Sequence, residues 1–411
     1  MQRRSFLIGA SGFAALTACS GSGGQPAAGP GTSALGTTSP TSSTSSSMPP
    51  VDRGLPAPGT AGLVDEAYYQ ARVDEYLTYA AADPRLGSAS GVGVQLAMAR
   101  RDPDYVWAVD DVTVDGFAER WTQIDEWRDT RDFQFMYLNW LLVHGQGDTA
   151  TTRLGADFIA AVSQRVIDNR YRYDDPLPDD RIDHLWYWSE NHRIITLANE
   201  FLAGQFFPDE TFTVTGMTGA EHATRARPDI LDWIHERARF GFFEWHSNVY
   251  MAKNITPLLM LVELADDDEI VQAAARPGSL PRRHGRPLPP WRVRGSARAH
   301  VQEGQDDRRD EDTFDVAKLL FDRTPGDFRS PDSTTATYFC LAERYRPPQL
   351  VIDIAHDETV TVTRERHGIH VDPQEPISDT PEAPFGYDFK DPKNLPFWWS
   401  TGGSACGRSP R

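Results

Sequence analysis

The segment Ser189-Glu-Asn-His-Arg-Ile-Ile-Thr-Leu-Ala-Asn-Glu-Phe-Leu-Ala-Gly-Gln205 decides the fold class, because a helix-start signal is followed there by an amphipathic run. Ser189 is a favourable N-cap, since its hydroxyl can accept a hydrogen bond from a backbone N–H of the first turn. Apolar residues then recur at three- and four-residue spacing through Ile194 and Ala198, which is the period of a helix with one buried face. The sequence therefore predicts a helix over 189–205.

Six further stretches show the same period, at 64–82, 114–128, 132–144, 154–169, 220–240 and 247–265. Turn-forming Gly, Pro and Asp residues separate them. Long helices in succession with few strand-like runs favour paired antiparallel helices, arranged as a bundle or as an (α/α) toroid. We expect a mainly α protein, with an α-helical toroid of helical hairpins over residues 61–346.

The pattern changes after Arg346-Pro-Pro348. The segments 350–355 and 359–363 are rich in β-branched residues and are separated by a turn, which is typical of two strands. We therefore predict that residues 347–411 form the start of a β-sandwich-like domain. This domain is expected to be truncated, because the chain ends about sixty residues after the domain begins.

The first residues predict export. Arg3 and Arg4 precede a short apolar run that ends at Leu16, which is typical of a twin-arginine signal. Leu16-Thr-Ala-Cys19 matches a bacterial lipobox, in which the signal is cut before the cysteine and the thiol is lipidated. Residues 1–19 are therefore the expected signal peptide, and the Gly/Ser/Thr/Pro-rich residues 20–60 an unfolded linker. We expect a mature protein anchored through Cys19 to the outer face of the cell membrane.

Charge and cysteine content exclude several classes of protein. The formal net charge is −18, which disfavours nucleic acid as a partner. Besides the lipobox cysteine there are only Cys340 and Cys406, so disulfides do not organise the fold. The set of His184, His192, Glu244 and His246 is conceivable for a metal, but it has no HExxH-type spacing. We expect neither a metal nor another cofactor.

Residues 276–310 do not fit their surroundings. They are dense in Arg, Pro and Gly directly after a regular helical pattern. They are either a basic disordered loop or a GC-rich gene translated in the wrong frame between two compensating frameshifts. We favour the frameshift, because the shifted codons of 297–306 permit a sequence that begins His-Gly-Arg-Thr-Tyr. The tail 404–411 has the same composition.

Two short segments, 186–194 and 241–250, combine aromatic rings with amide and acid/base groups. Such a combination suits a site that holds a sugar ring and moves protons on it. The expected catalytic residues are Asn191, His192, Glu244, His246 and Tyr250. The expected substrate-binding residues are Trp186, Trp188, Glu190, Arg193 and Trp245. Both segments also allow a plain structural interpretation, in which the tryptophans fill the core, His192 bonds a carbonyl group and Tyr250 only packs.

The tandem hairpins, the Trp-rich segment that leads to Asn191-His192, the later Tyr250 and a β domain after the helices resemble the bacterial toroid-plus-sandwich polysaccharide lyases. That group includes chondroitin/hyaluronate lyases and heparinase II/III-like enzymes. The resemblance covers residues 63–400 in architecture, through short motifs. It implies that Asn191 neutralises a uronate carboxylate, that His192 serves as base or support, and that Tyr250 protonates the leaving oxygen. In that group an Arg or second basic group also assists the reaction. No Arg of this chain matches it, and the His-Gly-Arg of the shifted frame is the candidate.

Removing a proton next to a carboxylate requires a neutralised charge, a base and an acid. These requirements and the resemblance predict an exported, lipid-anchored, carbohydrate-active protein that is polysaccharide lyase-like and acts on a polysaccharide or oligosaccharide. One alternative is a glycoside hydrolase with Glu190 and Glu244 as its two carboxylates. The other is a non-catalytic glycan-binding lipoprotein, or an inactive remnant.

Overall fold

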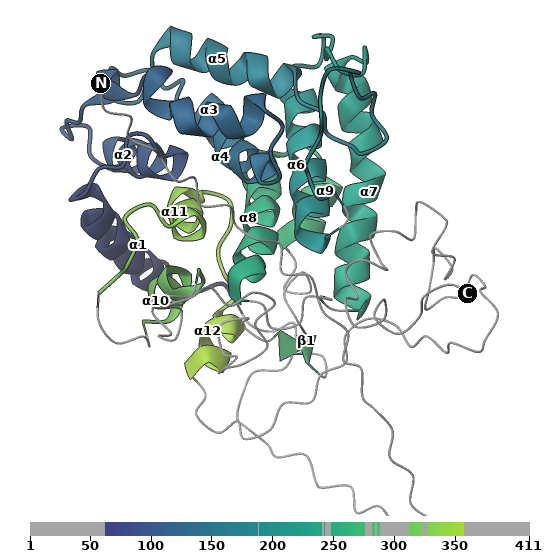
Figure 1. Ribbon diagram of the computed structural model, residues 1–411. Helices are drawn as coiled ribbons and strands as arrows, with labels where there is room; N and C mark the ends of the chain where they lie inside the picture. Colours follow the sequence, from purple (N-terminus) through teal and green to yellow (C-terminus); the bar gives the residue numbers. More distant parts are fainter. Residues whose placement is uncertain are drawn as a thin grey trace, which may run out of the picture. The chain divides into compact units, whose positions relative to one another are not determined.

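The computed structural model describes residues 62–187, 189–240, 242, 248–275, 282–283, 286–287, 312–322 and 327–356. The chain divides into two units, residues 1–52 and 53–411, and every described residue belongs to the second. This part of the chain is mainly α-helical, with twelve α-helices and one hairpin of two-residue strands (Figure 1). Across the described residues, we find no helix whose length and apolar character would let it span a bilayer.

The elements of the first half are α1 (Glu66–Ala81), α2 (Ala89–Arg101), the 3₁₀ turns η1 (Val109–Asp111) and η2 (Asp115–Phe117), α3 (Ala118–Asp125), α4 (Arg131–His144), α5 (Ala156–Ile167) and α6 (Glu190–Phe206). Those of the second half are α7 (Gly219–Phe240), α8 (Asn248–Leu264), α9 (Asp268–Ala275), the antiparallel strands β1 (Arg282–Arg283) and β2 (Arg286–Pro287), α10 (Phe314–Phe321), α11 (Thr334–Leu341) and α12 (Gln349–His356).

The seven predicted helices are confirmed as α1 and α3 to α8. The deciding segment forms α6, and the backbone N–H of His192 donates to the Ser189 hydroxyl at 3.3 Å. Helices α2, α9, α10 and α11 were not predicted. Most side chains of α2 and α11 are buried, and a helix buried on every side has no single apolar stripe that reveals its period.

The strand prediction for 350–355 is wrong, because these residues belong to helix α12. Leu350, Val351 and Ile352 are buried, and α12 packs against α10. The His356 ring also bonds the Phe321 carbonyl oxygen at 2.9 Å. Tertiary packing therefore overrides the strand preference of this β-branched run. The second predicted strand, 359–363, and the remainder of the proposed β domain lie outside the described residues.

Five helices contact one another in succession: α2 packs on α4, α4 on α6, α6 on α8, α8 on α11, and α11 again on α2. We call these the core helices. The helices α1, α3, α5, α7, α9 and α10 each pack against at least one core helix, and they are called the outer helices. Each core helix therefore buries side chains toward two neighbouring core helices as well as toward outer ones.

Side-chain pairs show that α4, α6 and α8 run in the same direction. Near the N-terminal ends of α4 and α6, Asp132 contacts His192 at 2.7 Å, and further along both helices Asn139 donates to Asn199 at 2.9 Å. At the C-terminal ends, the Gln205 side chain donates to the Leu264 carbonyl at 2.8 Å, which joins α6 to α8. The first turns of these three helices therefore lie at the same end.

The remaining core helices follow the same direction. Thr256 of α8 and Thr335 of α11 share a hydrogen bond at 2.9 Å, and Glu263 at the end of α8 accepts the Glu343 N–H at 2.8 Å just after α11. Ser90 at the start of α2 donates to the Asp332 carbonyl before α11 at 2.9 Å. All five core helices are thus parallel, and the outer helices return the chain between them.

Candidate functional site

A histidine–carboxylate pair lies at the N-terminal ends of α4 and α6. Nδ1 of His192 is 2.7 Å from Oδ2 of Asp132, and both side chains are buried. The His192 ring also stacks on the partly buried Phe133 ring, with centroids 5.0 Å apart and planes 6° apart. A carboxylate at Nδ1 favours the tautomer that carries the proton on that nitrogen, in which Nε2 is the basic nitrogen.

Lys253 of α8 lies beside the same aromatic ring. Its Nζ is 5.3 Å from the Phe133 ring centroid and 3.8 Å from Oδ2 of Asp312. Burial lowers the pKa of Lys253, but Tyr137, Asp312 and Asp132 outweigh burial and raise the pKa above its ordinary value. The ammonium is therefore charged at neutral pH. Sequence reasoning missed Lys253, although it lies three residues after Tyr250 and so on the same face of the helix.

Asn191 lies in the first turn of α6, as the sequence predicted, and its side chain is fully buried. The Ser189 hydroxyl donates to its Oδ1 at 2.6 Å. Its Nδ2 has no hydrogen-bond partner among the described residues. An unpaired buried amide N–H costs about 1–3 kcal/mol, so this donor is suited to an acceptor that reaches the end of the helix.

Glu190 and Arg193 are both engaged by the outer helix α7. The Glu190 carboxylate pairs with Arg237 at 3.0 Å, with both side chains buried, and its carbonyl oxygen accepts the Trp233 indole N–H at 3.0 Å. Arg193 pairs with Glu236 at 3.5 Å. A carboxylate that neutralises a buried guanidinium is already engaged in an ion pair, and leaving that guanidinium unpaired is costly, so it is poorly suited to donate a proton to a sugar. These contacts favour a structural role for Glu190.

The loop before α6 presents Trp186, which is 40% exposed. Its backbone N–H donates to Asp129 at 3.2 Å, just before α4. The loop is fixed by Asp183, which binds Arg131 and also accepts from Arg170 at 2.6 Å. Burial opposes ionisation of Asp183, but Arg131 and Arg170 outweigh it and hold the pKa at about 2. An exposed indole on an anchored loop suits the binding of an apolar sugar face.

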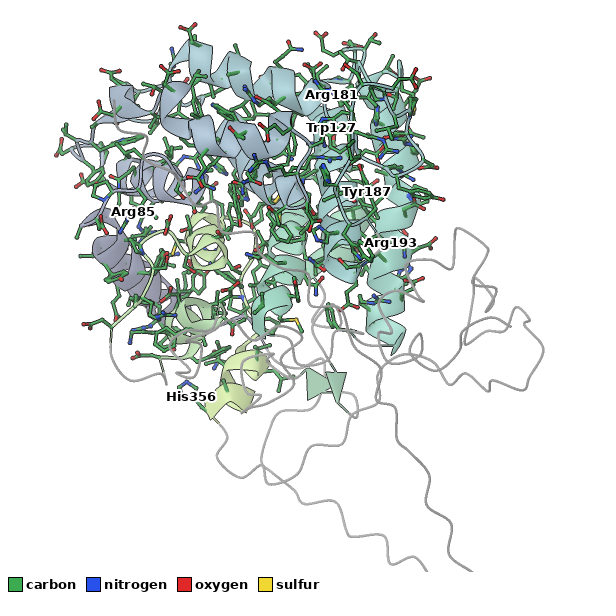
Figure 2. All side chains as sticks on the ribbon, in the orientation of Figure 1. Arg85, Trp127, Arg181, Tyr187, Arg193 and His356 are labelled. Atoms are coloured by element: carbon green, nitrogen blue, oxygen red, sulfur yellow. The ribbon has the colours of Figure 1, made fainter. Side chains whose placement is uncertain are left out.

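The turn between α3 and α4 is strained at Trp127, whose φ is +51°. A bulky residue rarely adopts this left-handed conformation. The Arg181 guanidinium lies 5.0 Å from its ring centroid (Figure 2), and that of Arg131 lies 5.3 Å from it. The Trp127 carbonyl oxygen accepts the His184 N–H at 3.1 Å. These contacts hold the turn from which α4, and with it Asp132, begins.

Other predicted site residues are placed only in part. Tyr250 lies in the first turn of α8 and is half-buried, so it is at the same end of the parallel helices as His192. Trp188, Glu244, Trp245 and His246 lie outside the described residues. Within the part of the chain that the structure describes, no group of three or more His, Cys, Asp or Glu side chains could hold a metal ion.

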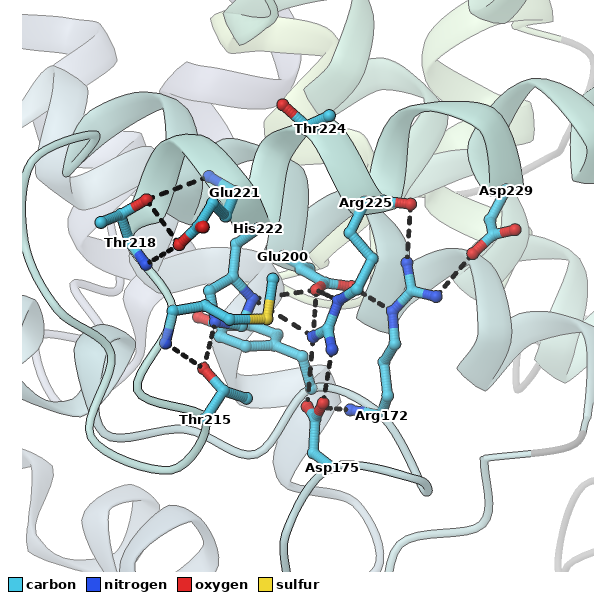
Figure 3. Close-up of polar contacts among 12 residues, drawn as sticks. Arg172, Asp175, Glu200, Thr215, Thr218, Glu221, His222, Thr224, Arg225 and Asp229 are labelled. Carbon is cyan, nitrogen blue, oxygen red and sulfur yellow. Dashed lines mark hydrogen bonds and ion pairs between the residues drawn. The ribbon is translucent and has the colours of Figure 1, made fainter.

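A second buried polar cluster surrounds Glu200 in the middle of α6 (Figure 3). Its carboxylate accepts hydrogen bonds from His222 at 2.9 Å, from Arg225 at 2.7 Å and from Arg172 at 2.7 Å. Burial opposes ionisation, but these three partners together lower the pKa of Glu200 below its ordinary value. We call this set of four residues the Glu200 cluster.

The Glu200 cluster also reaches Thr215, whose hydroxyl is 2.8 Å from Nε2 of His222. This Thr–His–Glu order is that of a hydrolytic triad. However, the Thr215 hydroxyl also accepts the Met217 N–H at 3.2 Å, His222 is fully buried, and two guanidinium groups already neutralise the carboxylate. The cluster therefore fastens the loop before α7 to α6 and has the character of a structural clamp.

Comparisons with protein-family models, with curated proteins and with solved structures found no match. What this chain does is therefore inferred from its own residues. Its geometry defines a mainly helical protein with a buried Asp–His pair, a neighbouring lysine and an exposed tryptophan near the first turns of parallel helices.

Proposed function

We propose that this chain is an exported, lipid-anchored, carbohydrate-active protein that cleaves a uronate-containing glycan by β-elimination. The observation that carries the proposal is the Asp132–His192 pair at 2.7 Å, at the end where the first turns of α4, α6 and α8 meet. A carboxylate that orients an imidazole is a common arrangement for a base that takes a proton from carbon.

The helix arrangement supports an (α/α) toroid as the finer fold. Such a toroid needs parallel inner helices that contact one another in a closed succession, with an outer helix between each two. The core helices α2, α4, α6, α8 and α11 contact in a closed succession, and their side-chain pairs run in one direction. This agrees with the resemblance of the sequence to the toroid-type polysaccharide lyases.

In the proposed reaction, Nε2 of His192 removes the proton from the carbon that bears the uronate carboxylate. Asp132 stabilises the imidazolium that forms. The electron pair from the broken C–H bond forms the new C=C bond as the glycosidic C–O bond breaks, and Tyr250 protonates the departing oxygen. Charge on the carboxylate grows during proton removal, so a cation and an amide N–H beside it lower the barrier. Lys253 and Asn191 are the residues suited to these two roles.

The location of the protein follows from its first residues. Arg3 and Arg4 direct export, Cys19 carries the lipid anchor, and residues 20–60 link that anchor to the helical part. An anchored enzyme on the outer face of the membrane meets polysaccharides before they enter the cell.

The third basic partner of the resembling lyases belongs to residues 276–310, which we propose are translated out of frame. Sequencing the gene across those codons and across 404–411 tests that origin directly.

Product analysis tests the proposed reaction. The full chain is incubated with uronate-containing polysaccharides and with the same polymers reduced to neutral sugars. Elimination gives an unsaturated sugar that absorbs in the ultraviolet and contains no added water, and we expect this product only from the uronate form. A saturated product with added water would instead show hydrolysis. Binding without any product would show a glycan-binding protein.

A further inference from the structure

The ion pair between Lys253 and Asp312 joins a partly buried ammonium to an exposed carboxylate. The two charged atoms are 3.8 Å apart, which is longer than a direct N–H···O hydrogen bond. The Lys253 side chain is 22% exposed and that of Asp312 is 39% exposed. A partly exposed pair at this distance is weak, so Asp312 is a partner that another carboxylate can replace.

This ion pair lies near His192, the proposed catalytic base. Lys253 and His192 both lie about 5 Å from the Phe133 ring, so the ammonium is within about 10 Å of the imidazole. A uronate holds its carboxylate on the same carbon that loses the proton. For one sugar to meet both residues, its carboxylate must lie at Lys253 and its C–H bond at His192. The unpartnered Nδ2 of the fully buried Asn191 adds a donor in the same first turn of α6 as His192.

We infer that Asp312 occupies the carboxylate-binding position of Lys253 in the free protein, and that a sugar carboxylate displaces it on binding. Asp312 is thus an internal competitor of the substrate, and Lys253 is the residue that selects acidic over neutral sugars. The inference rests on the proposed function only for the identity of the ligand as a uronate. It does not require that the bound sugar be cleaved.

Binding measurements on the full chain test this inference. The probes are short hyaluronan or chondroitin oligosaccharides and the same oligosaccharides with their carboxyl groups reduced to alcohols. Lys253→Met should weaken binding of the acidic form by about tenfold or more and leave the reduced form unchanged. Asp312→Asn should tighten binding of the acidic form by about two- to fivefold, since a weak competing pair is removed.

A matched control is available in α10, where Lys318 pairs with Asp322 at 3.5 Å. Asp322→Asn makes the same chemical change at another lysine–aspartate pair and should leave binding unchanged. The Lys253→Met/Asp312→Asn double variant should bind like Lys253→Met alone, because Asp312 acts only through the ammonium. Thermal unfolding of each variant checks that the protein remains folded.

The outcomes separate this inference from the proposed function. Tighter binding by Asp312→Asn together with no unsaturated product would support the competitor and remove the lyase. Unsaturated product together with unchanged affinity in both single variants would support the lyase and overturn the competitor. Weaker binding by Asp312→Asn, or no binding of either oligosaccharide by any variant, would also overturn it.

Discussion

Two histidine–carboxylate pairs of similar geometry lie along helix α6, yet their surroundings differ sharply. His192 meets Asp132 at 2.7 Å in the first turn, and His222 meets Glu200 at 2.9 Å near the middle. Glu200 also binds two guanidinium groups and His222 is sealed from solvent. Asp132 binds the imidazole, and the nearest lysine is shared with an exposed aspartate. On the proposed function, the Asp132–His192 pair takes the chemical role, and the Glu200–His222 pair, whose carboxylate two guanidinium groups already neutralise, takes the structural one.

The largest expected effect comes from a substitution in the Asp132–His192 pair. His192→Gln should reduce the rate of β-elimination by about 10²- to 10⁴-fold, which is the range that a general base contributes. The glutamine can still donate to Asp132, so unfolding should change little. The initial rate of unsaturated product and the denaturation midpoint measure the two effects. The exposed His235 provides the control His235→Gln, and a His192→Gln enzyme as fast as this control would exclude His192 as the base.

The matching substitution in the Glu200 cluster should act on stability. Glu200→Gln removes the buried negative charge between Arg172 and Arg225, which keep Asp229 and Asp175 as partners. The lost charged hydrogen bonds are expected to lower the free energy of unfolding by about 2–3 kcal/mol. Chemical denaturation measures this loss. The exposed Glu119 gives the control Glu119→Gln. Equal midpoints for the two variants would show that the cluster does not clamp the fold.

A smaller effect concerns acid stability at the loop that carries Trp186. The pKa of Asp183 is lowered from 3.8 to about 2 in the folded protein. Its ionised form therefore contributes stability that is fully present above the unfolded pKa near 4 and is lost as the pH falls through about 2. The contribution is on the order of 2 kcal/mol, given 1.36 kcal/mol for each pKa unit. Asp183→Asn should flatten the fall in unfolding free energy between pH 4 and 2, and an unchanged slope would contradict this assignment.

The sequence predicted the parts of this molecule that depend on local chemistry. The cap at Ser189 and the helical period located seven helices, and the Asn191-His192 pair fell in the first turn as expected. Helices α2 and α11 were not predicted because burial on every side removes their apolar stripe, and α9 and α10 were not predicted because each is only eight residues long. Helix α12 was taken for a strand because packing outweighed its β-branched residues. Asp132 and Lys253 were not found as partners, since each lies about sixty residues from His192 and only the fold brings them near it.

The common direction of the core helices has an electrical consequence. Each α-helix carries a partial positive charge at its first turn, and five parallel helices direct these charges toward the same end. The whole chain nevertheless bears a formal net charge of −18. The polyanionic glycan of the proposed function would thus be repelled at long range and attracted only close to this end. Salt weakens the long-range repulsion more than the short-range attraction, because the Debye length is about 10 Å at 0.1 M ionic strength. Moderate salt should therefore speed the encounter between this protein and an acidic glycan, the reverse of the behaviour of a uniformly basic protein.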